Sequence, residues 1–271
     1  MNSGQKIEVT ILGCGSSGGV PRVGGNWGDC DPNNPKNRRR RCSLLISATG
    51  ENGGQTNVII DTGCDIREQL LDAGISSVDA VFYTHDHADH THGIDDLRVL
   101  ALNDRKRVEV YANRPTLERL KSAFGYCFQA PSGSPYPPIL NANEIDSGGI
   151  ITIDGEGGPI TLHAFNQEHG NIKSLGFRIK NMAYSCDVSD IPKSSFEHLK
   201  NLDVWIIDAL RRTPHPSHFS LEDALHWIER FEPKQAYLTN MHIDLDYQTV
   251  LAETAENVQP AYDGLNFVIS G

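Results

Sequence analysis

The stretch THDHADHTHG at residues 84–93 decides the fold, and it directly follows the apolar run AVFY at residues 80–83. The apolar run predicts a short buried strand, so the polar stretch begins where this strand ends. Within six residues the stretch places three imidazoles and a carboxylate that can act together: His85, His87, Asp89 and His90. Such side chains are usually exposed or paired, and crowding them at a strand end costs stability unless a cation compensates. The stretch therefore predicts a metal centre, and a solvated polar loop is the alternative.

The spacing within the stretch indicates two neighbouring metal positions. His85 and His87 are two residues apart, so in an extended chain they point the same way and can share one ion. Asp89 and His90 then turn toward a second position, because four groups this close do not fit comfortably into one coordination sphere.

This stretch resembles the H-x-H-x-D-H signature of the metallo-β-lactamase superfamily, and the resemblance extends along most of the chain. It implies an α/β fold, a four-layer αββα sandwich with a dinuclear metal site between the sheet edges. We expect one hydrolase domain over residues 1–271. The resemblance also implies that His85, His87 and a later histidine hold the first ion. Asp89, His90 and a final histidine would hold the second ion, and one aspartate would bridge the two.

Later residues match the remaining positions of this family pattern. His169 follows an expected strand at residues 160–165 and matches the third histidine, with a plain surface-loop histidine as the alternative. Asp187 ends an apolar run and matches the bridging carboxylate, and His242 follows another apolar run and matches the final histidine. Asp61, in the segment IIDTG, resembles the first family motif. That match implies a carboxylate that orients a ligand or its turn, with a simple turn residue as the alternative.

Other segments resemble the phosphodiesterase branch of this superfamily, which includes the PhnP family of phosphoribosyl cyclic phosphate phosphodiesterases and the tRNase Z enzymes. The segment GCGSSGGVP at residues 13–21 follows the first expected strand, and its backbone N–H groups and small side chains suit an anionic group. Ser16 and Ser17 are therefore candidate substrate contacts. The segments at residues 61–67 and 238–247 resemble the same branch.

A further histidine is a candidate general acid. The segment PHPSHFS at residues 214–220 precedes an expected helix at residues 221–231. In the phosphodiesterase branch, a histidine placed this way lies over the metals, and an imidazole that titrates near neutrality can protonate a leaving alkoxide. His218 fits that position, with Asp89 as the second expected catalytic residue. His215 is the second choice and a tentative substrate contact, and the alternative is that both histidines order a proline-rich loop.

The composition limits the classes of function. The 271 residues include 24 lysines and arginines against 35 aspartates and glutamates, a formal net charge of −11. A protein that binds nucleic acid through a broad basic face usually has the opposite balance. No run of about 18 apolar residues is present, which excludes a membrane span. From the polar N-terminus and six irregularly spaced cysteines we expect free thiols and a cytoplasmic location.

Two features depart from the pattern of the branch. A C-x-C-x-x-C group of a structural zinc site is missing, because Cys30 and Cys42 are widely separated, so we expect no structural zinc from them. A long arm of the kind that clamps the tRNA elbow is missing too. The basic run KNRRRR at residues 36–41 predicts a solvated loop, with a patch that steers or clamps a phosphate group as the alternative.

Together these features predict a metal-dependent phosphodiesterase that acts on a small, cyclic phosphodiester. Two divalent ions, Zn²⁺ first and Mn²⁺ or Fe²⁺ as alternatives, would lower the pKa of a shared water. The expected partner is a small phosphorylated sugar or nucleotide; nucleic acid and membrane are not expected, and a homodimer is compatible with the sequence. The alternative functions are a tRNA 3′-processing endonuclease and a non-catalytic metal- or nucleotide-binding protein on the same scaffold.

Overall fold

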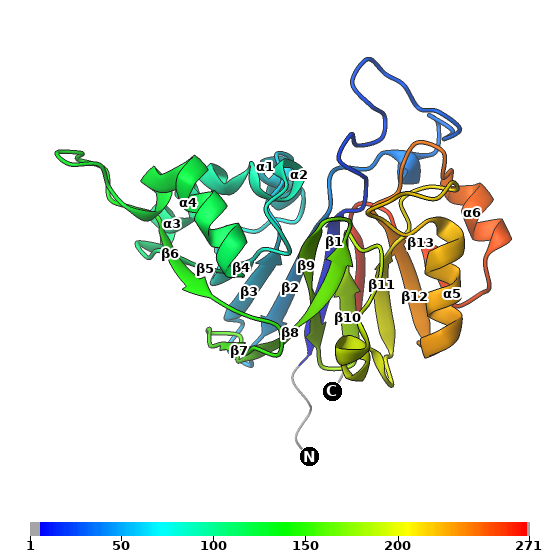
Figure 1. The fold of residues 1–271 in the computed structure, drawn as a ribbon. Coiled ribbons are helices and arrows are strands. Elements are labelled where there is room, and N and C mark those ends of the chain that lie inside the picture. The colour runs from blue at the N-terminus through cyan, green and yellow to red at the C-terminus, as the bar shows by residue number, and fades with distance from the viewer. Residues whose placement is uncertain (1–5, 270–271) are drawn as a thin grey trace.

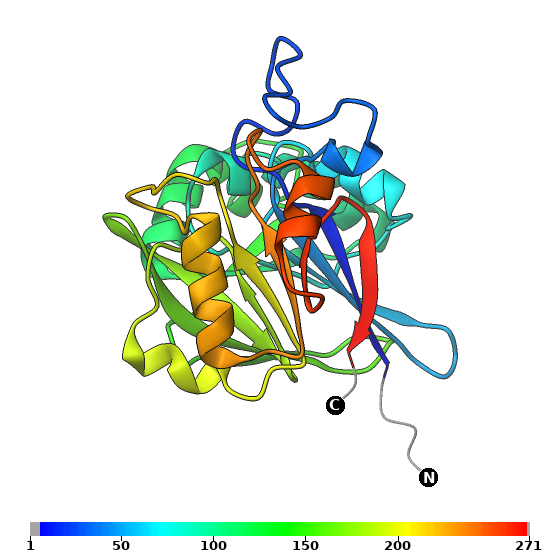
Figure 2. The same cartoon turned by 90° about the vertical axis from the view of Figure 1, so that its right-hand side faces the viewer.

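The computed structural model describes residues 6–269 as two seven-stranded sheets that lie face to face, with helices on their outer sides (Figures 1 and 2). The layers are helix, sheet, sheet and helix, which confirms the αββα sandwich predicted from the sequence. Both sheets combine parallel and antiparallel strand pairs. Among the described helices, none is long and apolar enough to cross a membrane.

The first sheet uses the N-terminal half of the chain and the last strand, in the spatial order β14-β1-β2-β3-β4-β5-β6. Its strands are β1 (Ile7–Gly13), β2 (Ser43–Thr49), β3 (Gln55–Ile60), β4 (Ala80–Phe82), β5 (Val108–Ala112), β6 (Leu140–Glu144) and β14 (Leu265–Ile269). The helices on its side are α1 (Ile66–Asp72), α2 (Ala88–Thr91), η2 (Ile94–Asp96), α3 (Leu97–Asp104) and α4 (Arg114–Phe128) (Figure 1).

The second sheet has the spatial order β13-β12-β11-β10-β9-β8-β7. Its strands are β7 (Ile150–Ile153), β8 (Ile160–His169), β9 (Ile172–Ile179), β10 (Met182–Ser185), β11 (Val204–Asp208), β12 (Gln235–Thr239) and β13 (Val258–Pro260). The remaining helices are η1 (Pro35–Asn37), η3 (Lys193–Leu199), α5 (Leu221–Phe231) and α6 (Tyr247–Glu253). Helix α5 starts at the capping box of Ser220 and Asp223 and has the bounds predicted from the sequence.

The core explains why β4 is apolar throughout. Ala80 and Phe82 face the cluster between the two sheets, whereas Val81 faces the cluster beneath the helices, and all three are fully buried. A strand covered on both faces needs such a continuous apolar run. The ring of Phe82 meets that of Phe177 edge to face, with centroids 5.5 Å apart, and this contact joins the two sheets. Burying each such side chain contributes roughly 1.5–3 kcal/mol.

Parallel pairing brings several strand ends to one edge of the sandwich. Strands β3 and β4 are parallel, and so are β10, β11 and β12. Residues that follow the carboxyl ends of parallel strands lie together at that edge. Three of them have a left-handed backbone: Asp61 (φ 64°), Asp187 (φ 53°) and Asn240 (φ 61°). Aspartate and asparagine tolerate this conformation better than most residues, so the chain can turn sharply at these three positions.

Two glycines let the turn after β3 pack against helix α2. The N–H of Thr62 donates to the carbonyl of His90 at 2.8 Å, and the N–H of Gly93 donates to the carbonyl of Thr62 at 2.9 Å. A Cβ on Gly63 would lie 2.1 Å from the Asp89 carbonyl oxygen, and one on Gly93 would lie 2.1 Å from that of Gly63. Only glycine allows this close approach, which holds the THDHADHTHG stretch in place.

Residues 14–42 form a long loop that projects beyond this edge (Figures 1 and 2). Arg39 is 1% exposed, and its Nη2 donates to the carbonyl of Leu245 at 2.8 Å. The next two arginines form ion pairs: Arg40 Nε with Asp263 at 3.1 Å and Arg41 Nη1 with Asp65 at 2.9 Å. For these three arginines the predictions of a solvated loop or a phosphate clamp are wrong, because their side chains anchor the loop. Cys30 and Cys42 are buried in separate apolar clusters.

Candidate metal centre

Four side chains from three segments converge at this edge of the sheets. His85 and His87 follow β4, His169 ends β8, and Asp187 follows β10. One ligand atom from each of the four lies within 4.8 Å of the others. The structure thus brings together the residues predicted for the first ion. Strand β8 continues past the predicted residue 165, because His169 still pairs with Ile172 of β9, so His169 is a strand residue and not a loop residue.

One nitrogen in the group of His85, His87, His169 and Asp187 has no hydrogen-bond partner in the described chain and could bind a cation. The Nε2 atom of His85 is buried and has no hydrogen-bond partner among the described residues. It lies 3.7 Å from Asp187 Oδ2, and His169 Nε2 lies 3.7 Å from the same oxygen. Two ligand atoms that are each about 2 Å from a tetrahedral zinc ion lie roughly 3.3 Å apart. The two distances from histidine nitrogens to Asp187 Oδ2 are therefore slightly longer than in a site that holds zinc. The ligand types, three imidazoles and one carboxylate, fit a divalent ion.

A second group of donors shares Asp187 with the first. His90 Nε2 lies 3.2 Å from Asp187 Oδ1 and 3.5 Å from Asp89 Oδ2. The structure adds Cys186, whose thiol lies 3.1 Å from Asp187 Oδ1 and within 4.8 Å of the His90 donor. The sequence reasoning expected only histidines and carboxylates here. Burial raises the pKa of the Cys186 thiol well above its usual value, so the protonated thiol donates to Asp187.

His242 lies outside both groups. Its Nδ1 is 3.0 Å from Asp244 Oδ1, and its Nε2 contacts the guanidinium of Arg22. Asn240 takes the place beside Asp187, where its Nδ2 donates to Asp187 Oδ1 at 3.0 Å. The left-handed turn at Asn240 directs that side chain toward Asp187, and the next residues then run toward the 14–42 loop. The structure therefore places Asn240, and not the predicted His242, at the end of β12 that faces the cluster.

Asp61 holds His90 from the side away from Asp187. This fully buried carboxylate accepts three hydrogen bonds of 2.8 Å, from the Thr84 N–H, the Thr84 hydroxyl and His90 Nδ1. This contact fixes the ring so that Nε2 faces Asp187, where an ion would take the place of the Nε2 proton. Burial raises the pKa of Asp61, while His90 and Thr84 act in the opposite direction. The geometry matches an orienting carboxylate, as the sequence resemblance implies.

The charges around the cluster favour cation binding. Burial lowers the pKa of both His85 and His169, so their imidazoles are neutral at pH 7 and keep a lone pair for an ion. Burial alone would raise the pKa of Asp187, but His90 above all outweighs it and holds the pKa well below its usual value. Burial lowers the pKa of His90, but Asp187 and Asp61 outweigh it and raise the pKa well above its usual value. The shared carboxylate is therefore ionised, with neutral His85 and His169 on one side and protonated His90 on the other.

His218 is held over the cluster by a buried aspartate that sequence reasoning missed. Its Nδ1 lies 2.9 Å from Asp208 Oδ2, and its Nε2 lies 3.8 Å from Asp187 Oδ2. Burial lowers the pKa of His218, but Asp208 and Asp187 outweigh it and raise the pKa to about 9. Asp208 is fully buried at the end of β11, which raises its pKa to about 6. A sequence signal for Asp208 exists: it directly follows the apolar run WII at residues 205–207, just as Asp61 and Asp187 each follow a largely apolar run.

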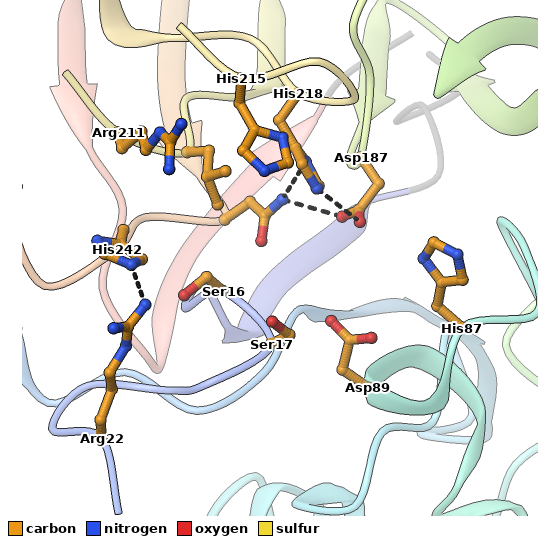
Figure 3. Close-up of a pocket in the computed structure, with 12 residues that line it drawn as sticks. Ser16, Ser17, Arg22, His87, Asp89, Asp187, Arg211, His215, His218 and His242 are labelled. Atoms are coloured by element: carbon orange, nitrogen blue, oxygen red, sulfur yellow. Dashed lines mark hydrogen bonds and ion pairs between the residues drawn. The ribbon is translucent and has the colours of Figure 1, made fainter. Parts of the chain in front are cut away.

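A cavity of about 310 Å³ opens beside these groups. Figure 3 shows its labelled lining residues, which include Ser16, Ser17, His215 and His218. The structure thus places the predicted substrate contacts and the predicted general acid around one cavity. His215 Nδ1 contacts the N–H and hydroxyl of Ser217 at 3.3 and 3.2 Å, which orders the loop before α5.

We expect Asp61→Asn to weaken metal binding without removing a ligand. The Asp61 carboxylate accepts at both oxygens, whereas an amide has one accepting oxygen and one NH₂ group that only donates. One side of the contacts to Thr84 and His90 is therefore lost, the orientation of His90 weakens, and we expect affinity for the more weakly held ion to fall by about 10–100-fold. Competition between metal-stripped protein and a chromophoric zinc chelator measures this. Asp79→Asn is the matched control, because Asp79 accepts the Asn57 N–H at 2.9 Å at the opposite edge of the sheet. Equal zinc affinity in wild type and Asp61→Asn would show that Asp61 has no orienting role.

Comparisons with known proteins show the family of this chain. A family model for the beta-lactamase superfamily domain matches residues 56–243. The crystal structure of a new diphosphatase from the PhnP family has a TM-score of 0.85 at 34% identity, covering 97% of this chain and 97% of that one. An octanoyltransferase of Porphyromonas gingivalis is 33% identical over 268 residues, and a ribonuclease Z of Archaeoglobus fulgidus is 32% identical over 132 residues.

The two curated relatives are longer proteins. The matched region covers 97% of this chain but 52% of the octanoyltransferase, and 47% of this chain but 39% of the ribonuclease Z. The chain thus spans about half the length of the first relative and less of the second. The diphosphatase and ribonuclease Z neighbours are hydrolases by name. With its H-x-H-x-D-H stretch at the sheet edge, the chain belongs to the beta-lactamase superfamily, with relatives in the PhnP and tRNase Z families.

Proposed function

We propose that this chain is a metal-dependent phosphodiesterase that hydrolyses a small, cyclic phosphodiester of a sugar or nucleotide. One observation carries the proposal: two groups of side chains that could hold a metal ion share Asp187, and Asp187 lines the same cavity as His218, which Asp208 holds. A shared carboxylate suits two adjacent ions, and a protonated imidazole above it suits the departure of an alkoxide.

The proposed metal ligands divide into two sets. His85, His87, His169 and Asp187 would hold the first ion, and three imidazoles with one carboxylate suit zinc, with Mn²⁺ or Fe²⁺ as alternatives. The second ion would lie beside His90, Asp89 and Asp187, a set with fewer nitrogen donors than the first. When bound, two divalent ions supply an activated water and neutralise charge on the phosphoryl oxygens.

The proposed task of His218 is to protonate the leaving oxygen. Asp208 accepts from Nδ1, which leaves the Nε2 proton directed into the cavity near Asp187. With a pKa of about 9, the imidazole carries that proton at neutral pH. As the bond between phosphorus and the leaving oxygen breaks, the Nε2 proton moves to that oxygen, and the neutral imidazole keeps its hydrogen bond to Asp208.

The size of the cavity and the net charge favour a small substrate. A cavity of about 310 Å³ lies at the small end of the usual range for ligand sites. The formal net charge of −11 does not favour a long polyanion, and three of the four arginines at residues 38–41 anchor the loop to the protein. The match to ribonuclease Z keeps a tRNA 3′-processing endonuclease as the second candidate.

Turnover by metal-stripped and reloaded protein tests the proposed function. We expect Zn²⁺ or Mn²⁺ to restore hydrolysis of bis-p-nitrophenyl phosphate and of a nucleoside 2′,3′-cyclic phosphate.

His87→Ala should lose most of this activity together with about one equivalent of metal, measured by plasma mass spectrometry. Full turnover by metal-loaded His87→Ala would contradict the ligand assignment. Cleavage of precursor tRNA without turnover of either small ester would favour the endonuclease, and metal binding without any turnover would favour a binding protein.

Leaving-group dependence tests the role of His218. We expect His218→Ala to keep its metal but to hydrolyse the cyclic phosphate about 10²–10⁴-fold more slowly, because an alkoxide needs a proton to depart. Esters of p-nitrophenol should slow much less, since p-nitrophenolate departs without one. The control is His226→Ala, which changes an exposed histidine on α5. Equal slowing of both substrates by His218→Ala would contradict proton donation by this residue.

A further inference from the structure

Four large apolar side chains are exposed on neighbouring segments at the helical side of the first sheet. They are Val99 and Leu102 of α3, Tyr126 of α4 and Tyr136 of the segment between α4 and β6, and each is 46–73% exposed. Apolar residues scattered singly over a surface are ordinary, whereas several on neighbouring segments indicate a surface that binds another molecule. In Figure 1 these segments lie at the opposite end of the sandwich from α5 and α6.

A groove runs between α3 and the segment at residues 131–139. One hollow of about 410 Å³ is lined by Tyr126 and Tyr136, and a second hollow of about 280 Å³ is lined by Leu102. Pro137 lines both hollows, so they lie side by side and form one groove, which we call the α3 groove. None of the residues that line it also lines the cavity of the candidate metal centre.

One wall of the α3 groove is ordered before any partner binds. The segment PSGSPYPP at residues 131–138 contains four prolines, each of which fixes its own φ. The N–H of Tyr136 donates to the hydroxyl oxygen of Ser134 at 3.2 Å. The guanidinium of Arg98 lies 5.8 Å from the centre of the Tyr126 ring, within the range of a cation–π contact. These restraints reduce the entropy that binding would cost.

The rim of the α3 groove is basic, although the chain as a whole has a formal net charge of −11. The residues that line it include four cations and no carboxylate: Arg98, Arg105, Lys106 and Arg107. Arg98 has an ion pair with Asp95, and Lys106 has one with Asp79, whereas Arg105 and Arg107 have none within the described residues. Such a rim complements a partner that carries carboxylates.

The backbone around the α3 groove favours a helix over an extended peptide as the partner. An extended peptide gains its affinity from backbone hydrogen bonds to the surface that it joins. Proline has no N–H, so Pro135, Pro137 and Pro138 offer no backbone donors along the wall. A helix satisfies its own backbone and needs apolar contacts. Val99 and Leu102 are three residues apart on α3 and so present one face for such packing.

We propose that the α3 groove binds an acidic amphipathic helix of a partner protein. Leu102, Tyr126 and Tyr136 contact the apolar face of that helix, and Arg105 and Arg107 pair with carboxylates beside that face. Nucleic acid fits less well, because it requires a broad basic face, whereas these cations border an apolar floor. A bilayer presents no side chains that would fill the two hollows. The proposal does not depend on the proposed phosphodiesterase activity.

Selection from a displayed library of helical peptides tests the proposal. The bait is the full chain with its metal, and peptides that bind the Leu102→Asp variant are removed first. We expect the enriched peptides to carry leucine, isoleucine or phenylalanine on one helix face and aspartate or glutamate beside that face. Enrichment of basic peptides would overturn the proposal, and so would a failure to find peptides that prefer wild type to Leu102→Asp.

Fluorescence anisotropy with one enriched peptide measures the contribution of each part of the groove. We expect Leu102→Asp to weaken binding by at least about tenfold, because a buried carboxylate replaces an apolar contact. The double variant Arg105→Glu/Arg107→Glu should also weaken binding, and it should reduce the loss of affinity that salt causes in wild type. The matched controls are Ile150→Asp and Lys121→Glu, which change exposed residues outside the groove and should bind as wild type does.

Three further measurements exclude loss of fold and identify any other occupant. Leu102→Asp should unfold at the wild-type Tm in circular dichroism, because this side chain is exposed. A dimer in sedimentation that Leu102→Asp abolishes would show that a second copy of the chain covers the groove, which would overturn a separate partner. Binding of wild type, but not of Arg105→Glu/Arg107→Glu, to a stem-loop RNA or to phosphatidylglycerol vesicles would overturn the helix as the occupant.

Discussion

The rest of the site depends on one buried carboxylate that is enclosed by imidazoles. The oxygens of Asp187 lie 3.2–3.8 Å from nitrogens of four histidines: His85, His90, His169 and His218. Two of these histidines are held from behind by another buried carboxylate, His90 by Asp61 and His218 by Asp208. The same unit of carboxylate, imidazole and carboxylate therefore occurs twice around Asp187, once at the proposed second ion and once at the proposed proton donor. Crowding these groups in the interior is unfavourable unless each has a partner, and the proposed cation would complete the set.

The sandwich provides this arrangement because parallel strands end at one edge. The left-handed turns at Asp61, Asp187 and Asn240 reverse the chain at once, so each side chain stays near the strand that carries it. Glycine at positions 63 and 93 lets the turn after β3 contact the stretch after β4 backbone to backbone. The long 14–42 loop is tied down by Arg39, so it can bring Arg22 to the far side of the same cavity. The candidate metal ligands and the proposed proton donor thus depend on one edge of the sheets and on the loop above it.

The sequence allows prediction of those candidate site residues that are neighbours in the chain or that directly follow an apolar run. The THDHADHTHG stretch, Asp61, His169 and Asp187 all lie at strand ends, where a polar residue after buried ones is conspicuous. Asp208 has the same signal, but its importance depends on His218, which reaches it only through the fold. The contact between Arg22 and His242 joins residues 220 positions apart, and no local pattern indicates it. No local pattern indicates the role of the arginine run either, since the burial of Arg39 depends on the carbonyls of His242 and Leu245, about 200 residues away.

Diffraction from metal-loaded crystals tests the central claim most directly. We expect anomalous difference maps, collected at the absorption edge of the added Zn²⁺ or Mn²⁺, to show one peak bounded by His85, His87, His169 and Asp187. A second peak should lie on the other side of Asp187, beside His90 and Asp89, and its occupancy should rise with the metal concentration in the soak. Crystals that bind the added ion elsewhere, with no anomalous density within bonding distance of Asp187, would contradict a metal centre at this edge of the sheets.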